Sequence, residues 1–370
     1  MPEIVVPTFR LSAPDAPDWS KVQRVLVVKL RHHGDVLLTS PVFSALKIHA
    51  PHVQVDALVY DDTAPLLQHH PDIHTLHVIG RQWRKAGRLR QFLCEWRLLR
   101  ALRTRRYDVL IHLTDSRRGA WLVRALGVKV SVAPTSRKRG WKNRFTHLFT
   151  LAGGNRRHTV EYHLDALRRI GIHPGQDARA LTLVPGASAT DDIAQCLAAH
   201  QLMPQQFIHF HAASRWLFKC WPIEKTAALI DQFTAAGWPV VLTGAPDPAE
   251  RALNAAIVAR LSRPIVDLTG KTSLLGLAAL TAQARLFVGV DSAPMHIAAA
   301  MQTPTVALFG PSGEIEWAPW RVANRVLVSS HPCRPCGKDG CGGGKLSECL
   351  EVIEVAQVWQ ACQPWITPAV

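Results

Sequence analysis

Two runs of alternating strands and helices constrain the fold of this sequence more than any other feature. Short apolar segments rich in β-branched residues predict a first set of strands at residues 24–30, 53–60, 73–79, 107–113 and 128–132. A second set is predicted at residues 207–210, 239–243, 264–268, 286–290 and 305–309. Segments with helical spacing separate the strands, and such alternation favours parallel sheets with helices on both faces. We therefore predict an α/β fold with two parallel sheets, each covered by helices on both faces.

The composition changes between the two runs, which indicates where one domain ends. Residues 174–190 contain proline and glycine without strong periodicity, and we interpret them as a linker. We predict an N-terminal domain over residues 1–180, a C-terminal domain over 181–350, and a helical tail over 351–370 that could pack back on the N-terminal domain. Open parallel sheets bind ligands beyond the carboxyl ends of their strands, so the two domains should face each other across a cleft.

Positive charge is concentrated in the first half of the chain. Residues 1–180 hold 30 Lys/Arg against 14 Asp/Glu, a net charge of +16, whereas residues 181–370 hold 13 against 14, a net charge of −1. The densest stretch, residues 81–106, has ten cations and one acid. Such a field attracts nucleic acid, an anionic membrane surface or a phosphorylated substrate. The simpler alternative is a solvated helix face.

Several classes of protein are disfavoured by what the sequence lacks. No apolar run reaches the roughly 18–20 residues that cross a bilayer. The first twenty residues are polar and interrupted by proline, unlike a secretory signal, so we expect a cytoplasmic protein with reduced thiols. A dinucleotide-binding GxGxxG and an intact phosphate-binding P-loop are both missing. No Asp-x-Asp supplies a carboxylate pair for a divalent metal.

The loop after the first predicted strand, Arg31-His32-His33-Gly34-Asp35, carries the first candidate site. Gly34 permits a tight turn, and Asp35 then falls at the start of a helix. One interpretation is that Asp35 only caps this helix. The other is that its carboxylate is a general base at the mouth of the cleft, placed to accept a hydroxyl proton.

Two loops in the second half could hold a phosphorylated ligand. In the loop over residues 211–222, Ser214, Arg215 and Lys219 could bind phosphate oxygens; the alternative is an exposed loop with incidental cations. In the loop over residues 289–300, small residues precede a helix whose free N–H groups suit a diphosphate. The alternative there is a helix capped by aspartate or serine and followed by a core histidine.

Three segments in this order resemble glycosyltransferase family 9, the ADP-heptose:lipopolysaccharide heptosyltransferases. They read VLVVKLRHHGDVLLTSPVFSALK, HAASRWLFKCWP and VGVDSAPMHIAAAMQTPTVALFGPS, and the resemblance extends over about residues 22–360. The cysteine-containing tail at residues 333–341 is most similar to the heptosyltransferase III branch. The resemblance implies a GT-B fold of two Rossmann-like domains, with the acceptor on the N-terminal domain and the nucleotide-sugar on the C-terminal domain. It also implies an inverting reaction without a metal or other cofactor.

The resemblance also implies roles for individual residues. Asp35 matches the proposed catalytic base, and Lys219 matches the lysine that neutralises the donor diphosphate. Thr272 matches a position near the adenine, while a threonine of the second loop is matched only loosely, by Ala213 or Ser214. The donor-binding loop is matched by Asp291, Ser292, Ala293 and His296. Ser292-Ala293 replaces the Thr-Gly that is common in the family, a mild departure that keeps a hydroxyl and an N–H.

The implied acceptor is a phosphorylated, lipid-linked oligosaccharide on the cytoplasmic face of the inner membrane. We expect basic residues of the N-terminal domain to face this acceptor and the membrane: Arg31, Arg81, Arg84, Lys85, Arg137, Lys138, Arg139 and Lys142. We expect four tryptophans to help docking: Trp83, Trp96, Trp121 and Trp141. The protein should then be peripheral on that membrane and should not bind nucleic acid.

Other interpretations remain open from the sequence alone. Cys333, Cys336, Cys341 and Cys349 could form a four-thiolate zinc site, although irregular spacing favours free thiols in a glycine-rich loop. The chain could use another nucleotide sugar, as a different GT-B glycosyltransferase or an epimerase. It could also be a basic nucleic-acid-binding protein, or a scaffold without catalytic activity.

Overall fold

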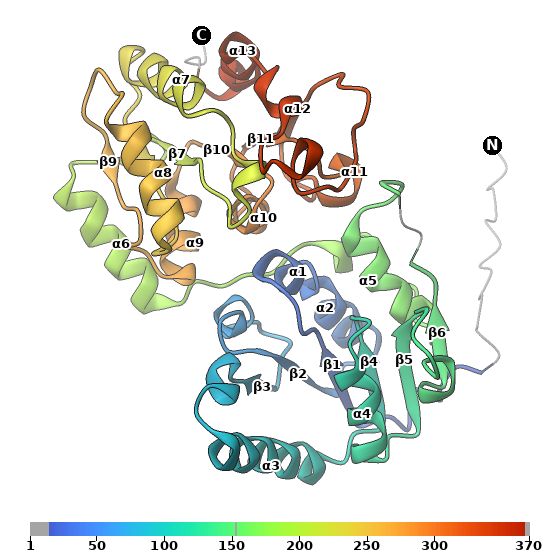
Figure 1. Ribbon diagram of the computed structural model, residues 1–370. Helices are drawn as coiled ribbons and strands as arrows, with labels where there is room; N and C mark the ends of the chain where they lie inside the picture. Colours follow the sequence, from blue (N-terminus) through green and yellow to red (C-terminus); the bar gives the residue numbers. More distant parts are fainter. Residues whose placement is uncertain (1–14, 152–153, 367–370) are drawn as a thin grey trace, which may run out of the picture.

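The computed structural model describes residues 15–151 and 154–366, apart from the side chain of Arg84. Its strands form two six-stranded parallel sheets, ordered β3-β2-β1-β4-β5-β6 and β12-β11-β10-β7-β8-β9 (Figure 1). The first sheet contains β1 (Arg24–Val28), β2 (Gln54–Tyr60), β3 (Thr75–Ile79), β4 (Val109–His112), β5 (Val130–Pro134) and β6 (His147–Phe149). The second contains β7 (Ile208–His211), β8 (Val240–Leu242), β9 (Val266–Asp267), β10 (Leu286–Val290), β11 (Thr305–Phe309) and β12 (Asn324–Val328). Both sheets have the same doubly wound order, so the prediction of two Rossmann-like units is confirmed.

Helices cover both sheets. Those before β7 are α1 (His33–Leu37), α2 (Ser40–His49), α3 (Arg88–Arg105), α4 (Arg117–Leu126), α5 (Thr159–Arg168) and α6 (Ala187–Ala199). Those after β7 are α7 (Ile223–Ala235), α8 (Pro248–Val258), α9 (Leu274–Gln283), α10 (Ala293–Ala300), α11 (Glu314–Trp317), α12 (Glu348–Glu351) and α13 (Val355–Ile366). Among the residues described, none of these helices has the length and apolarity that a membrane span requires.

The sheets form because their central strands are apolar on both faces. In β1, Val25 and Val27 belong to one buried cluster, while Leu26 and Val28 belong to another on the opposite face. Successive strand side chains point to opposite faces, so a continuous apolar run requires a cover on each side. The helices provide that cover, and the loops beyond the strands are left to carry the site.

The structure differs from the prediction at several elements. β6, β12, α5 and α6 were not predicted: β6 has three residues, and β12 is an edge strand with no fully buried residue. The helix expected directly after Asp35 is two helices, because Pro41 lies in the first turn of α2 and favours a break before it.

The predicted linker is packed rather than free. A 3₁₀ turn, η4 (Asp177–Arg179), lies against α2, and Ala178 and Leu181 join the apolar core of the first unit. The end of the segment already belongs to α6, which begins at Ala187. The low periodicity of residues 174–190 therefore marks a connection that changes direction, not an unstructured one. The predicted boundary at residues 180/181 lies within this connection and stays a prediction.

The C-terminal helix packs on the second sheet, so the packing on the N-terminal domain considered from the sequence is wrong for the described residues. Val358, Cys362 and Ile366 repeat every four residues of α13 and join the buried cluster of β7, β8, β10 and β11. This repeat gives the helix one apolar face, which the nearest sheet buries. Residues 1–14 and 367–370 of the predicted terminal domains lie outside the described residues.

The two units touch through α1 and α10, which face each other between the sheets in Figure 1. Leu37 of α1 and Ile297 of α10 share one apolar cluster. A second contact joins the Trp320 indole N–H to the backbone oxygen of Arg179 at 2.7 Å. The site described next lies beside the α1–α10 contact.

Candidate functional site

The three predicted loops meet between the two units. The first loop follows β1, and the other two follow β7 and β10. In each sheet these strands flank the point where the strand order reverses, which is where open α/β sheets bind ligands. Gly34 shows how closely the loops approach: a Cβ atom added there would lie 2.8 Å from Cδ2 of His296. Glycine is therefore required for this approach.

Asp35 lies in the first turn of α1 and contacts a buried ammonium group. The Lys29 Nζ atom is 3.3 Å from Oδ1 of Asp35, and the Lys29 residue is 5% exposed. Nζ also donates to the backbone oxygen of Leu113 at 3.2 Å and lies 2.9 Å from Nε2 of His163. His163 Nδ1 lies 2.9 Å from the Leu38 oxygen, which assigns the ring proton to Nδ1 and leaves Nε2 to accept from Lys29. The three ammonium protons thus have three acceptors.

The electrostatics of this cluster follow from its burial. Burial lowers the pKa of Lys29, and the Asp35 carboxylate opposes that shift. Burial, with Lys29 beside it, holds the pKa of His163 well below its usual range, so the imidazole is neutral. Lys29 was missed by the sequence prediction, although a lysine at the end of an apolar strand was a signal for it.

Lys219 and Asp291, both predicted donor-binding residues, form an ion pair in the second unit. Lys219 ends the 3₁₀ turn η5 (Leu217–Lys219), and its Nζ lies 2.6 Å from Oδ2 of Asp291. The Asp291 side chain is 7% exposed and the Lys219 side chain 22%, so the lysine is not fully enclosed. A buried carboxylate thus holds a cation at the carboxyl end of the sheet.

The start of α10 is open beside this pair. Ser292 occupies the N-cap position, but its hydroxyl donates to the Val290 oxygen at 3.3 Å and caps no N–H group. The sequence alternative of a side-chain cap from Ser292 or Asp291 is therefore not what the structure shows. Ala293 begins the helix without a bulky side chain, so N–H groups of the first turn can meet an anion.

His296 lies one turn into α10 and is buried. Burial lowers its pKa to about 4, against the opposing effect of Asp291 and Asp35, so the ring is neutral near pH 7. Its Nδ1 atom has no hydrogen-bond partner among the described residues. An unpartnered polar atom inside a protein favours a ligand or a water there.

Two other predicted donor-binding residues, Ser214 and Thr272, make no hydrogen bond to Lys219 or Asp291 in the described part of the chain. Ser214 is buried in the loop after β7, where its hydroxyl oxygen accepts from the Trp216 N–H at 3.3 Å and shapes the loop. Thr272 is half-buried in the turn between β9 and α9.

Two guanidinium groups contact the first loop, which itself contains Arg31. Arg81, in the 3₁₀ turn η2 (Arg81–Arg84), pairs with Asp62 at 2.7 Å and donates to the Arg31 oxygen at 3.1 Å. Arg215, from the second unit, donates to Nδ1 of His32 at 3.3 Å. Burial lowers the pKa of His32; Asp35 opposes the shift, and Arg215, Arg81 and Arg31 add to it. The entrance to the site is therefore cationic on both sides.

The remaining predicted basic residues differ in their exposure and in their ion pairs. Lys85, Arg137, Arg139 and Lys142 are exposed, whereas Lys138 pairs with Asp115 at 2.9 Å, and the Arg84 side chain lies outside what the structure describes.

The four predicted docking tryptophans divide into two pairs. Trp141 is 2% exposed, and its N–H donates to the Pro134 oxygen at 2.7 Å, so its predicted place on a docking surface is wrong. Trp83 is half-buried against the first core. Trp96 and Trp121 are half exposed, at 49% and 50%.

All eight cysteines are free thiols in the structure, including the four weighed as a zinc site. Within residues 15–151 and 154–366, no group of three or more His, Cys, Asp or Glu side chains has an arrangement that could hold a metal ion.

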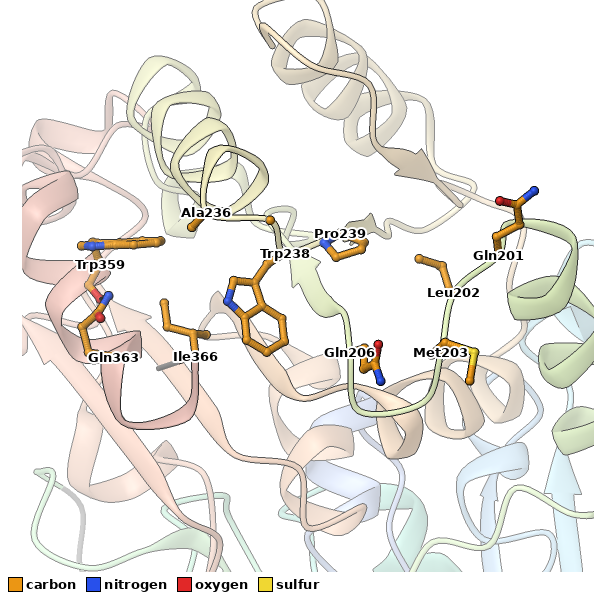
Figure 2. A pocket seen from close by; sticks show the side chains of 11 residues that line it. Gln201, Leu202, Met203, Gln206, Ala236, Trp238, Pro239, Trp359, Gln363 and Ile366 are labelled. Atoms are coloured by element: carbon orange, nitrogen blue, oxygen red, sulfur yellow. Dashed lines mark hydrogen bonds between the residues drawn. The ribbon is translucent and has the colours of Figure 1, made fainter. Parts of the chain in front are cut away.

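One cavity of the second unit lies away from these loops. It has a volume of about 650 Å³. Figure 2 shows that Trp238, Trp359, Met203 and Ile366 are among the residues that line it. Residues that immediately precede β7 and β8 line it, so it opens at the amino end of the second sheet. It is therefore distinct from the site built by the three loops.

Comparisons with known proteins agree with this arrangement. The profile of Glycosyltransferase family 9 (heptosyltransferase) matches residues 95–346. Lipopolysaccharide heptosyltransferase 3 of Escherichia coli is 37% identical over 296 residues, which are 79% of this chain and 84% of that protein. Lipopolysaccharide heptosyltransferase 1 of Pseudomonas aeruginosa is 30% identical over 356 residues, 93% of this chain and 95% of that protein.

Solved structures share the fold. A glycosyl transferase family 9 protein from Veillonella parvula superposes with a TM-score of 0.80 at 24% identity, covering 94% of this chain and 98% of that one. The E. coli heptosyltransferase WaaC with ADP-2-deoxy-2-fluoro heptose superposes with a TM-score of 0.70 at 21% identity, covering 92% and 99%. The GT-B fold predicted from the sequence is therefore confirmed.

Proposed function

Since the chain belongs to glycosyltransferase family 9 and is a heptosyltransferase of lipopolysaccharide core biosynthesis, we propose that it performs the heptosyltransferase III step. It transfers heptose from ADP-heptose to the inner core, with inversion at the anomeric carbon and without a metal ion. The similarity to heptosyltransferase 3 supports the step, and the WaaC structure with an ADP-heptose analogue supports the donor. The observation that carries the proposal is the contact between Gly34 and His296, which brings the Asp35 loop to the Lys219–Asp291 pair.

The second unit would hold the donor. Lys219, fixed by Asp291, places its ammonium group beside the open first turn of α10. These two positive features suit the diphosphate of ADP and the charge that it gains as the glycosidic bond breaks. They would supply the stabilisation that a metal supplies in other glycosyltransferases. The neutral His296 ring offers Nδ1 to a donor hydroxyl or to a phosphate-bound water.

The first unit would hold the acceptor. Asp35 takes the proton of the attacking acceptor hydroxyl, while the Lys29 ammonium group holds the carboxylate in place and balances its charge. The hydroxyl oxygen attacks the anomeric carbon from the face opposite ADP, so the configuration inverts. Arg31, Arg81 and Arg215 suit a phosphorylated core sugar at the entrance. We place the protein at the cytoplasmic face of the inner membrane, where such an acceptor is held.

Turnover of ADP-heptose with truncated lipopolysaccharide acceptors tests this proposal. Asp35→Asn removes the base and should lower kcat by roughly 100- to 10,000-fold with ADP affinity unchanged. Lys219→Ala should instead weaken ADP binding as well as turnover. Asp72→Asn is the matched control, because this carboxylate binds Ser44 at 2.9 Å, away from the three loops. Asp35→Asn that turns over like the wild type would exclude the assigned base.

The finer assignments need separate measurements. Product formed only on acceptors that already carry the preceding core heptoses supports the heptosyltransferase III step, and transfer to a shorter core contradicts it. A product with the donor's anomeric configuration excludes inversion, and loss of turnover in excess chelator excludes metal independence. UDP that protects the protein from heat better than ADP would favour another nucleotide sugar.

A further inference from the structure

Helix α3 has two apolar faces, of which only one is packed. Leu102 is fully buried, and Leu98 packs on the same core beneath the first sheet. A second stripe repeats at helical spacing on the outward side. It consists of Leu89, Phe92, Leu93 and Trp96, which are 74%, 64%, 42% and 49% exposed. Residues at this i, i+3, i+4, i+7 spacing share one side of a helix. Figure 1 shows α3 on the outside of the first unit, at the end away from the second.

The cations of α3 fall into two groups by partner. Two arginines fix the helix to its neighbours: Arg105 pairs with Asp56 of β2 at 2.7 Å, and Arg103 donates to the Ala125 oxygen of α4 at 2.9 Å. Glu95, the one acidic residue of the helix, pairs with Arg118 of α4. These contacts set which side of α3 faces outward.

The second group of cations is exposed beside the apolar stripe. It consists of Arg88, Arg90, Arg97 and Arg100. None of these four pairs with a carboxylate in the part of the chain that the structure describes. The Arg100 guanidinium lies 5.6 Å from the centre of the Trp96 ring, so the two side chains form one surface.

A recess continues this surface towards the end of the helix. It encloses about 450 Å³ and is lined by Trp96, Leu99, Thr104 and three arginines, Arg100, Arg103 and Arg106. Guanidinium groups bind phosphate oxygens through paired, charge-assisted hydrogen bonds. An apolar stripe next to an arginine-lined recess therefore matches a molecule with an apolar part and an anionic phosphate.

We propose that the outward side of α3 docks on an anionic phospholipid bilayer. The stripe enters the boundary between headgroups and acyl chains, and the arginines of the recess bind lipid phosphates. This surface deepens the proposed function and rests on it, because it gives the membrane location of that proposal a defined contact. A second copy of the chain is a poorer occupant, since two such faces would bring eight unpaired arginines together. A nucleic acid would match the arginines but leave the leucines in water.

Vesicle co-sedimentation tests this contact without any enzymatic turnover, so its failure is distinct from failure of the proposed reaction. The full-length protein is mixed with vesicles of phosphatidylcholine alone or of phosphatidylcholine with phosphatidylglycerol, at low and high NaCl. We expect binding to the anionic vesicles, weakened but not abolished by salt, because the apolar stripe is insensitive to screening.

Two variants separate the apolar and the cationic contributions. The double variant Phe92→Ser, Trp96→Ser should bind to vesicles at least about 10-fold more weakly than the wild type, because both side chains lose their burial in the bilayer. Arg97→Ser with Arg100→Ser should weaken binding about 25-fold, at about 5-fold for each arginine near an anionic surface. Ile315→Ser with Leu346→Ser is the matched control, because both side chains are exposed and apolar but lie in the second half of the chain. All variants should turn over a detergent-dispersed acceptor like the wild type.

Trp96 also reports insertion directly. Brominated acyl chains should quench part of the tryptophan fluorescence of the wild type, and Trp96→Phe should bind equally but lose that part. Equal vesicle binding by the stripe variant and the wild type would overturn the proposal. Self-association that the stripe variant abolishes, with vesicle binding unchanged, would assign the face to a second copy instead.

Discussion

At the scale of single residues, the buried lysine beside Asp35 offers the sharpest test. Lys29→Met should leave the carboxylate without its cation and His163 without its donor. We expect kcat/KM to fall at least about 10-fold, because the Asp35 carboxylate loses the group that holds it in place. Steady-state kinetics of the wild type, Lys29→Met and Lys29→Arg measure this. Lys29→Arg should restore part of the rate, and a kcat/KM of Lys29→Met equal to that of the wild type would contradict the role.

The sequence could single out Asp35 and Lys219 as candidates because both lie in loops that follow predicted strands and both match motifs of the resembled family. It could not identify the partners that fix their side chains. His163 is 134 residues from Lys29, and Asp291 is 72 residues from Lys219, so each pairing depends on how strands are ordered in a sheet. The prediction that Trp141 lies on a docking surface failed for a related reason. Its basic neighbours in the sequence indicated an exposed position, but its ring packs beside Phe145 with a distance of 4.9 Å between the ring centroids.

At the scale of elements, the contact between α1 and α10 should control the rate. Gly34→Ala places a methyl group 2.8 Å from the His296 ring, so the two helices must separate slightly. We expect kcat/KM to fall roughly 100-fold, which is the usual cost of a displacement of about 1 Å.

Gly175→Ala is the matched control for this variant, because nothing lies within 4 Å of a Cβ there and the backbone is not in the left-handed region. Urea unfolding of both variants and the wild type separates lost positioning from lost stability. A Gly34→Ala enzyme with full activity would show that the approach of these helices has no part in catalysis.

Sequence periodicity located some elements to the residue and missed others. β10 and β11 match their predicted bounds, since each has a clear apolar pattern with turn residues on both sides. β12 has only partly buried or exposed residues and includes Arg325, and β6 is too short to show a period. These two strands form because a neighbouring strand offers its edge, which is a property of the sheet rather than of their own residues.

At the scale of the whole molecule, buried histidines should make the fold sensitive to acid. Burial lowers the pKa of His112, His158, His211 and His296 to about 4. Below the unfolded pKa of about 6.5, the unfolded chain binds protons that the folded chain excludes. The free energy of unfolding should therefore be highest above that pH and fall towards pH 4, by up to about 1.4 kcal/mol per pH unit for each histidine.

Urea titrations from about pH 7 to about pH 5 measure this slope as a number of protons. His158→Gln should reduce the slope by about one proton, whereas His200→Gln, at an exposed position, should leave it unchanged. A free energy of unfolding that is equal at both ends of this range would contradict the neutral, buried state of these rings.

The division of the centre between two units, joined at Gly34 and His296, has a consequence for fidelity. The proposed proton acceptor belongs to one unit and the proposed diphosphate cradle to the other, so any separation of the units dismantles the centre. A donor bound to the separated form would have no carboxylate near its anomeric carbon. No general base would then activate a water molecule to attack that carbon. Separation of the two units would then protect a costly activated sugar from hydrolysis until an acceptor arrives.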